Sequence, residues 1–291
     1  MFTFESRHTT RFSDLDTQLH VTSITYEELA AEARFACLAA NGYDLQRILA
    51  DELQFIPLHS AARFHRQQMP GSQLLIRTSL QITATQELLW HQELLDKDQN
   101  LACEIRSLEV ARHHQGKEAV TLWPNREASA TIPAETFFYE PVPPFTHSCQ
   151  QIERQFNTYP SLRNFNWVYP AAQIWRFFED GRWNMFHQLG IDFRFINQTD
   201  TTAFFMGCNF EIRSPVQPNE PLLQKLWIER IDKIRVYLRQ EVFRPGQTQA
   251  ILRSREFIVF VSVSKSRPRR PAAEWIQRMF DYIEFREGIA L

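Results

Sequence analysis

Glycine is scarce in this sequence of 291 residues, which contains only 8 glycines. Loops that cradle the phosphates of nucleotides need closely spaced glycines, as in G-x-G-x-x-G and G-x-x-x-x-G-K-[ST], so that the backbone can approach the phosphate. Neither pattern occurs in the sequence. We therefore expect no phosphate-binding loop of these classes and no cofactor.

Cysteine is also rare. The four cysteines are far apart and form no C-x-x-C pair, and the 9 histidines show no spaced ligand set. Disulfide frameworks and zinc sites need such residues at short, regular spacing. We expect reduced thiols that pack as small apolar side chains in a reducing compartment, and no metal site. The cysteines are Cys37, Cys103, Cys149 and Cys208.

Long apolar runs and an excess of charge are absent as well. No run of about 18 apolar residues is present, and the chain begins with a polar, charged stretch where a secretory signal would be apolar. The formal net charge is -2, so no strong field draws the protein to nucleic acid or to an anionic membrane. We expect a cytoplasmic protein that binds neither.

What the sequence does contain is an internal repeat. A shift of 148 residues aligns Arg34 with Arg182 and Gly42 with Gly190. The same shift, without gaps, aligns further identical residues as far as Ala102 and Ala250. This regularity predicts two copies of one structural unit. The other matches are Asp44 with Asp192, Pro70 with Pro218, Leu74 with Leu222, Leu75 with Leu223, Gln92 with Gln240, Glu93 with Glu241, Gln99 with Gln247 and Ala102 with Ala250.

Each copy has the same predicted order, a helix that ends at a glycine and then β-rich segments separated by turn residues. This order predicts an α+β fold in which an antiparallel sheet wraps one long helix. The β-rich segments are 58–67, 73–85, 87–95 and 102–112 in the first copy and 203–213, 222–230, 234–243 and 250–263 in the second. We expect an N-terminal unit over residues 1–122, a proline-rich linker over 123–145 and a C-terminal unit over 146–291 that closes with an amphipathic helix at 272–285.

In the first copy, small and apolar residues begin to recur at steps of three and four near residues 21–26, which predicts the start of the helix. Thr25 and Glu28 fit a capping box, and Thr22 and Ser23 are alternative N-caps. The first backbone N–H groups of a helix lack partners within it, and the positive end of the helix dipole lies there. The helix start is therefore a suitable site for an oxygen that gains negative charge during a reaction.

Three ionisable side chains, Asp14, Asp16 and His20, precede this helix in the stretch RFSDLDTQLHV. A carboxylate there can cap the helix, pair with Arg11, or act in a cleft as a nucleophile or base. If the stretch is extended, Asp14 and Asp16 share one face, so one of them can pair with Arg11 while the other acts. A lone histidine is more often structural than functional, and the stretch by itself leaves these roles open.

The second copy lacks all three of these ionisable side chains. The residues at the corresponding positions are Leu162, Asn164 and Val168. A requirement of the fold should appear in both copies, whereas a requirement of chemistry need appear in only one. The difference favours a single active site in the first copy, with Asp16 as its carboxylate.

These stretches resemble a known family. SDLDTQLHVTSITY resembles the D-x-D-x-x-x-H-V-N-N-x-x-Y signature of hotdog-fold thioesterases, of the 4-hydroxybenzoyl-CoA thioesterase and acyl-ACP thioesterase types. YEELAAEAR and RFFEDGR both resemble the FEEAR stretch of the family's central helix. The resemblance covers nearly the whole chain and implies two tandem hotdog units, each a long central helix wrapped by an antiparallel sheet, which is the arrangement of acyl-ACP thioesterases.

The resemblance also implies roles for individual residues. Asp16 matches the catalytic carboxylate, either as nucleophile or as the base that activates water. His20 matches the histidine of the H-V pair, and Gln18 matches an amide that orients the catalytic groups. The matching oxyanion donors are the backbone N–H groups of Val21, Thr22 and Ser23.

The sequence departs from the family pattern at three places, one of which is the replacement of the two asparagines of the signature by Thr22 and Ser23. Leu19 replaces a glycine that commonly precedes the histidine. Gln67 stands where acyl-ACP thioesterases have a further carboxylate, and His65 lies close by as a substitute. Asp14, Arg11, His65 and Gln67 form the predicted supporting set around Asp16.

The implied activity is hydrolysis of acyl-CoA or of acyl thioesters of acyl carrier protein, which needs a carboxylate, an oxyanion hole and no metal. Two alternatives stay open. One is a hotdog hydratase or dehydratase that acts on acyl thioesters, although its motif spaces Asp and His five apart, whereas Asp16 and His20 are four apart. The other is a protein that binds acyl thioesters without catalysis. The two tandem units imply that the protein is a monomer or a homodimer of tandems.

Overall fold

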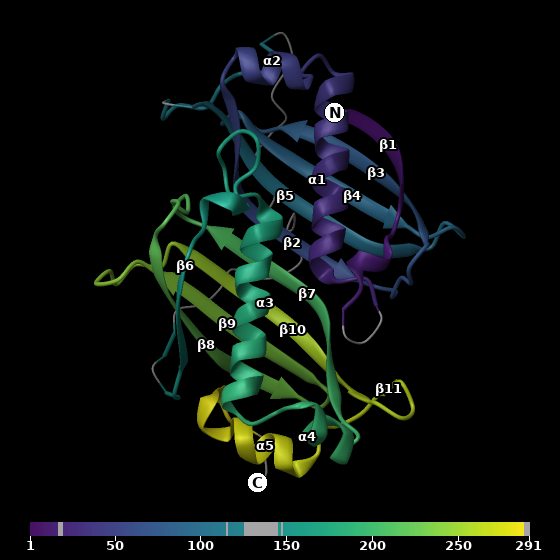
Figure 1. Cartoon of the computed structure of the whole chain (residues 1–291), viewed down its shortest axis with the longest axis vertical. Coiled ribbons are helices and arrows are strands. Elements are labelled where there is room, and N and C mark those ends of the chain that lie inside the picture. Colours follow the sequence, from purple (N-terminus) through teal and green to yellow (C-terminus); the bar gives the residue numbers. More distant parts are fainter. Residues whose placement is uncertain (17–19, 115, 125–144, 147, 288–291) are drawn as a thin grey trace. The chain divides into compact units, whose positions relative to one another are not determined.

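The computed structural model describes residues 1–16, 20–114, 116–124, 145–146 and 148–287 (Figure 1). The chain forms two compact units. The first comprises Met1–Tyr139 with Pro160–Trp175, and the second comprises Glu140–Tyr159 with Arg176–Leu291. Most of the predicted proline-rich linker, residues 125–144, lies outside the described residues.

The first unit is an antiparallel sheet in the strand order β1-β3-β4-β5-β2, and helix α1 (Ser23–Ala40) lies across one face of this sheet (Figure 1). Cys37 and Leu38 of α1 belong to the same buried apolar cluster as Trp90 of the sheet. The strands are β1 (Phe2–Thr9), β2 (Leu53–Phe64), β3 (Gln73–Ile82), β4 (Glu87–Leu95) and β5 (Leu101–His113), and the short helix α2 (Leu45–Ala50) follows α1.

The second unit repeats this plan, with strand order β7-β10-β9-β8 and with β6 also paired to β8. Helix α3 (Ala171–Gln188), which belongs to this unit from Arg176 onward, lies across its sheet (Figure 1). The strands are β6 (Ile152–Asn157), β7 (Thr202–Ile212), β8 (Pro221–Asp232), β9 (Arg235–Phe243) and β10 (Leu252–Ser262), and α4 (Phe193–Gln198) follows α3. The predicted α+β fold, a helix and sheet unit present twice, is confirmed.

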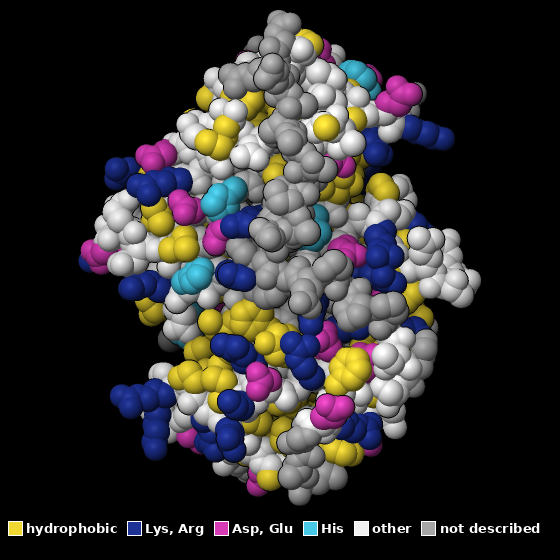
Figure 2. All heavy atoms as spheres, turned by 180° about the vertical axis from the view of Figure 1, so that it is seen from behind, with side chains coloured by type: hydrophobic (Ala, Val, Ile, Leu, Met, Phe, Trp, Pro, Cys, Tyr) yellow, Lys and Arg dark blue, Asp and Glu magenta, His cyan; other side chains and the backbone are white. Residues whose placement is uncertain are grey.

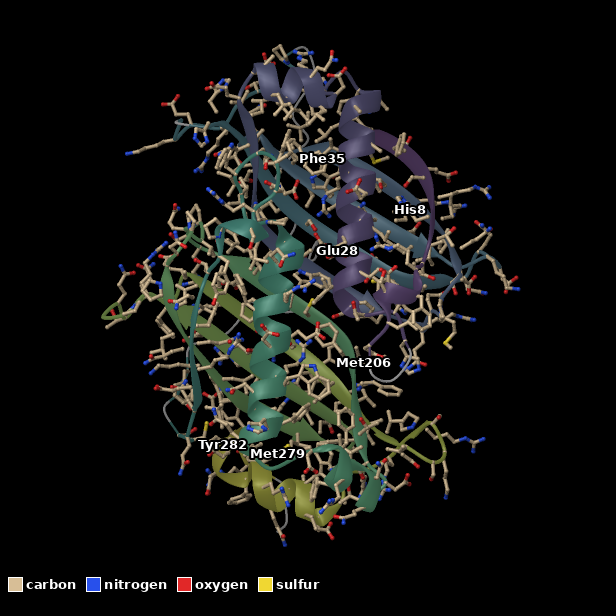
Figure 3. All side chains as sticks on the ribbon, in the orientation of Figure 1. His8, Glu28, Phe35, Met206, Met279 and Tyr282 are labelled. Carbon is tan, nitrogen blue, oxygen red and sulfur yellow. The ribbon has the colours of Figure 1, made fainter. Side chains whose placement is uncertain are left out.

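The structure differs from the sequence predictions at two kinds of element. Strands β1 and β6 were not predicted. Burial alternates along both strands, but few of their residues are apolar, and main-chain pairing to β3 and β8 secures both strands. The predicted closing helix is shorter than 272–285. It ends as α5 (Ala273–Met279), and the chain then forms a 3-10 turn and β12 (Ile283–Phe285), which pairs in parallel with β8. Met279 and Tyr282 mark this change in Figure 3.

The matches between the two copies correspond to the same hydrogen bonds. In the first unit, Gln92 Nε2 donates to the carbonyl of Ala30 on α1 at 2.8 Å. In the second, Gln240 Nε2 donates to the carbonyl of Phe178 on α3 at 2.9 Å. The repeated glutamine therefore ties the central helix to its sheet in both units.

The repeated glycine and aspartate end one helix and begin the next. Gly42 and Gly190 follow α1 and α3 with φ of 90° and 67°, the left-handed conformation that glycine adopts without strain. Asp44 and Asp192 then cap α2 and α4, where each side chain accepts a backbone N–H three residues ahead.

The described surface shows no dominant charge of one sign on the face drawn in Figure 2, where basic, acidic and apolar side chains intermingle. Within the described ranges, no helix is both long enough and apolar enough to cross a membrane.

Candidate active site

The approach loop leads from β1 to the start of α1 and is described at residues 11–16 and 20–22. Its first part is a 3-10 turn (Phe12–Asp14) closed by Arg11 and Asp14. The buried Asp14 carboxylate accepts hydrogen bonds from the Arg11 backbone N–H at 2.6 Å and from Arg11 Nε at 3.0 Å. The hydrogen bond to Asp14 raises the pKa of Arg11. Of the two aspartates, Asp14 is therefore the one that pairs with Arg11, and its role is to shape the loop.

Asp16 and His20 close the second part of the loop. The Asp16 N–H donates to the His20 carbonyl at 2.8 Å, and the His20 N–H donates to Asp16 Oδ1 at 3.1 Å. The matching residues of the second copy make the same two bonds. The Asn164 N–H donates to the Val168 carbonyl at 2.9 Å, and the Val168 N–H donates to Asn164 Oδ1 at 3.1 Å. One side-chain oxygen at this position is thus a requirement of the fold in both copies.

This match sharpens the comparison between the copies. The turn needs an acceptor oxygen, which Asp and Asn supply equally, and it needs only the backbone of His20, since Val168 replaces it. What the first copy adds is the second carboxylate oxygen of Asp16, its negative charge and the His20 imidazole. These additions distinguish the first approach loop from the second.

Two of the three backbone N–H groups predicted as oxyanion donors at the start of α1 have backbone partners. The Val21 N–H donates to the Gln68 carbonyl at 3.1 Å, and the Thr22 N–H donates to the Asp14 carbonyl at 2.9 Å. Both groups are occupied by backbone partners, so Val21 and Thr22 do not fit that role. Thr22 is instead the N-cap, and its side chain accepts the Thr25 N–H. Ser23 is the first residue of α1, so its backbone N–H remains the predicted oxyanion donor.

The predicted supporting residues are spread apart by the structure. Gln18 and Leu19 lie outside the described residues. His65 and Gln67 follow the end of β2 and are exposed. The neighbouring Gln68, which sequence reasoning missed, is buried and bonds to the approach loop through its carbonyl. No local pattern distinguishes Gln68 from Gln67, because the contact joins distant parts of the chain.

Sequence reasoning also missed a buried charge cluster between α1 and the sheet. Arg34 Nη2 lies 2.5 Å from Glu27 Oε1, Arg34 Nε lies 3.4 Å from Glu109 Oε1, and Arg34 Nη1 donates to Gln92 Oε1 at 2.8 Å. Glu27 is fully buried, and burial raises the pKa of its carboxyl, although Arg34 opposes the shift. The cluster joins α1 to β4 and β5 and holds the helix in place.

The raised pKa of Glu27 has a consequence for stability. Because the folded pKa lies above the ordinary value of 4.5, the stabilisation is complete below that pH and is lost as pH rises through the folded pKa. Glu27→Gln removes this titration. We therefore expect the free energy of unfolding of the variant, minus that of the wild type, to increase as pH rises. Urea unfolding of both proteins from about pH 4.5 to about pH 8 measures the difference. A difference that stays constant or shrinks with pH would contradict this account.

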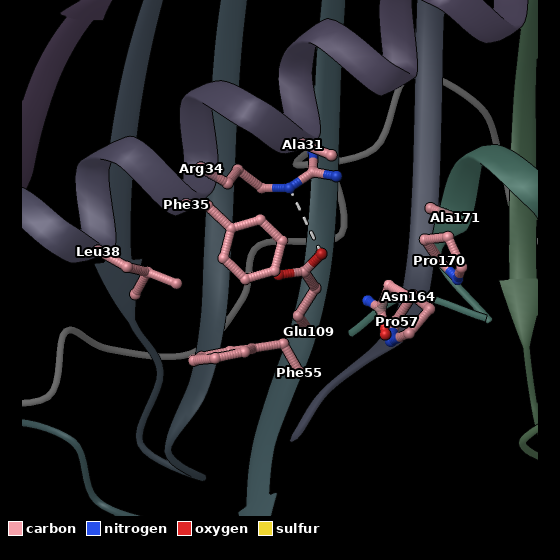
Figure 4. Close-up of a pocket in the computed structure, with 10 residues that line it drawn as sticks. All are labelled: Ala31, Arg34, Phe35, Leu38, Phe55, Pro57, Glu109, Asn164, Pro170 and Ala171. Carbon is pink, nitrogen blue, oxygen red and sulfur yellow. Dashed lines mark ion pairs between the residues drawn. The ribbon is translucent and has the colours of Figure 1, made fainter. Parts of the chain in front are cut away.

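A small cleft of the first unit borders this cluster (Figure 4). Phe35 and Leu38 of α1 and Phe55 of β2 form its apolar side, and the Arg34–Glu109 pair lies at its base. Asn164, the counterpart of Asp16, also lines it. Its volume is about 30 Å³, the space of one or two water molecules, so it holds no acyl chain as it stands.

Metal ligands do not gather in the described part of the chain, where no group of three His, Cys, Asp or Glu side chains is arranged to hold an ion. The four cysteines are free thiols. Burial raises the pKa of Cys37 to about 11, so this thiol stays protonated near neutral pH.

Comparison with known proteins finds matches over most of the chain. A family model described as "Thioesterase-like superfamily" matches residues 10–136 and 164–280. No curated protein matches the sequence. The structure resembles a protein described as an oleoyl thioesterase of Lactobacillus plantarum, with a TM-score of 0.71, 12% identity, and coverage of 88% of this chain and 95% of that one.

Two further solved structures are similar over the same extent. One is a 12:0-ACP thioesterase of Umbellularia californica, with a TM-score of 0.66, 10% identity, and coverage of 88% of this chain and 93% of that one. The other is an acyl-ACP thioesterase of Bacteroides thetaiotaomicron, with a TM-score of 0.61, 12% identity, and coverage of 89% of this chain and 97% of that one. At these identities the likeness shows the fold, two hotdog units in tandem.

Proposed function

The chain belongs to the thioesterase-like superfamily, and from this premise we propose that it hydrolyses acyl thioesters with Asp16 as the catalytic carboxylate. The observation that carries the proposal is the pair of matching turns in the two approach loops. Asn164 shows that the turn needs one side-chain oxygen, and Asp16 supplies that oxygen and a second one with a negative charge.

Two routes are consistent with this carboxylate. As a nucleophile, Asp16 attacks the carbonyl carbon, the C–S bond breaks, the thiolate leaves, and water then hydrolyses the resulting anhydride. As a general base, Asp16 takes a proton from the water that attacks the same carbon. In both routes the carbonyl oxygen gains negative charge, which the Ser23 N–H and the dipole at the start of α1 stabilise.

We propose acyl-CoA or acyl carrier protein as the carrier of the acyl group, in a cytoplasmic setting. Fold likeness to proteins named for acyl-ACP and oleoyl thioester hydrolysis supports this class of substrate. The test is release of free thiol from a panel of acyl-CoAs and acyl carrier protein thioesters of varied chain length. Thiol release above the uncatalysed rate supports hydrolysis. Binding without release indicates a non-catalytic protein, and a hydrated or dehydrated acyl product that keeps its thioester indicates the lyase alternative.

The His20 imidazole is the second group that the first approach loop has and the second loop lacks. His20→Val copies the residue of the second approach loop, so we expect the fold to be unchanged. If the imidazole helps to move a proton or to orient Asp16, kcat falls by about tenfold to a hundredfold. Thiol-release rates over a range of pH, with melting temperatures as the control for folding, measure the effect. An unchanged kcat at every pH would remove His20 from the mechanism.

A further inference from the structure

A second hollow of the first unit lies near the C-terminal end of α1, between α2, the start of β2 and residues 165–167. It is separate from the approach loop, which precedes the opposite end of α1. A helix of 18 residues spans about 27 Å. The volume of the hollow is about 150 Å³, the size of a cavity that holds a benzene ring. Its walls include Leu49, Gln54, His114, Phe165, Asn166 and Trp167.

The carboxamide of Asn166 is buried in this wall without a partner. The residue is 4% exposed, and among the described residues neither Oδ1 nor Nδ2 has a hydrogen-bond partner. Its backbone is fixed, because the Asn166 carbonyl accepts from Gln54 Nε2 at 3.0 Å. Leaving both a donor and an acceptor buried and unpaired is costly, and native structures rarely do so. The arrangement fits a ligand whose edge presents an adjacent acceptor and donor.

The neighbouring Trp167 is strained and exposed. Its φ is 67°, a conformation that bulky residues adopt only when the surroundings enforce it, and such strain concentrates at ligand sites. The Arg163 guanidinium lies 4.6 Å from the centre of the indole, yet Trp167 remains 61% exposed. Phe165, next to it, packs against Phe35 of α1 with ring centres 5.3 Å apart. The loop thus holds an indole at the mouth of the hollow on a rigid base.

We propose that this hollow binds a purine base, and that adenine is the base whose edge fits. The Asn166 Nδ2 group donates to a ring nitrogen of adenine, and Oδ1 accepts from the exocyclic amine, the bidentate pairing by which asparagine reads adenine. The indole of Trp167 supplies a surface for stacking. Leu49 and Phe165 give the site apolar walls. The exposure of Leu49, 53%, and of Phe165, 45%, leaves room for the second ring and the sugar to extend outward.

The adenine can come from a free nucleotide or from coenzyme A. Glu52 also lines the hollow, and its negative charge places the phosphates of either ligand away from this wall. The base site stands on Asn166 and Trp167 alone and does not rest on thioester hydrolysis. A protein that binds adenosine and releases no thiol would contradict the proposed function and leave this inference intact.

Calorimetric titration of the wild type with adenosine, coenzyme A and purine riboside tests the proposal. Purine riboside lacks the exocyclic amine, so we expect it to bind about tenfold more weakly than adenosine. Asn166→Leu and Trp167→Gly should each weaken adenosine binding by about tenfold or more. Trp167→Gly also relieves the left-handed strain, so its melting temperature should not fall in step with affinity. The matched controls Asn157→Leu and Trp183→Ala, an exposed asparagine and tryptophan elsewhere, should leave affinity unchanged.

The outcomes separate the sources of the base. Binding of both adenosine and coenzyme A shows a site for the base in either molecule, and binding of adenosine alone excludes coenzyme A as the source. Binding of coenzyme A without adenosine overturns the proposal, because the two molecules carry the same base. Failure of both to bind overturns the proposal. Equal affinities for adenosine and purine riboside, or full affinity in Trp167→Gly, overturn it as well, and neither result depends on whether Asn166→Leu folds.

Discussion

Replacing Arg34 by leucine is expected to lower the free energy of unfolding of the first unit by about 3–5 kcal/mol. The guanidinium is buried and contacts Glu27, Glu109 and Gln92. Without it, Glu27 and Gln92 Oε1 lose their partner in a medium that stabilises charge poorly, and Glu109 keeps the hydrogen bond from the Trp90 indole. The charged form of Glu27 then becomes unfavourable. Urea unfolding followed by far-ultraviolet circular dichroism measures the loss.

Two variants control this prediction. Adding Glu27→Leu to Arg34→Leu removes a charge that the first change leaves unpaired, so the double variant should recover part of the lost stability. Arg182→Leu makes the same change on α3, where the guanidinium bonds to the buried Glu256, and should destabilise the second unit similarly. A loss below about 1 kcal/mol for Arg34→Leu would show that the cluster does not hold α1 to its sheet.

Asp16→Asn is expected to lower kcat/KM for thioester hydrolysis by more than about a hundredfold and to leave the fold intact. The expectation of an intact fold comes from the protein itself, since Asn164 already closes the equivalent turn at the same 3.1 Å. The substitution keeps Oδ1 as an acceptor for the His20 N–H and removes only the second oxygen and the charge. Melting temperatures and far-ultraviolet spectra should therefore coincide with those of the wild type.

The reciprocal variant Asn164→Asp provides the control for added charge. It gives the second approach loop a carboxylate but no histidine, because Val168 stands in the place of His20. Its thiol-release rate should match that of the wild type. A gain of activity in Asp16→Asn when Asn164→Asp is added would show that the second loop can serve as an active site, contrary to the proposal of one site.

The sequence allowed the repeated unit to be predicted because the repeated residues make local or paired structural bonds. Gly42 and Gly190 adopt the same left-handed turn, and Asp44 and Asp192 cap the same short helices. Such residues leave a signal at a fixed spacing, so a simple shift of the chain finds them. The helix and its glycine stop followed directly from this signal.

The parts that the sequence did not predict depend on contacts between distant segments. The occupied N–H of Val21 reaches Gln68, and the buried Glu109 reaches Arg34 on another element. The sequence also did not reveal that Asp16 and Asn164 close the same turn. The change from Asp to Asn between the copies suggested a lost function, although both side chains supply the same acceptor oxygen. The absence of an ionisable residue in the second copy therefore overstated the difference between the two turns.

The most direct test of the central claim is the rate of thiol release by Asp16→Asn relative to the wild type, on the best acyl thioester of the panel and with equal amounts of folded protein. The claim that Asp16 acts on the thioester predicts a ratio below about one hundredth. Equal rates for the two folded proteins would contradict it, and Asp16 would then be a turn residue like Asn164.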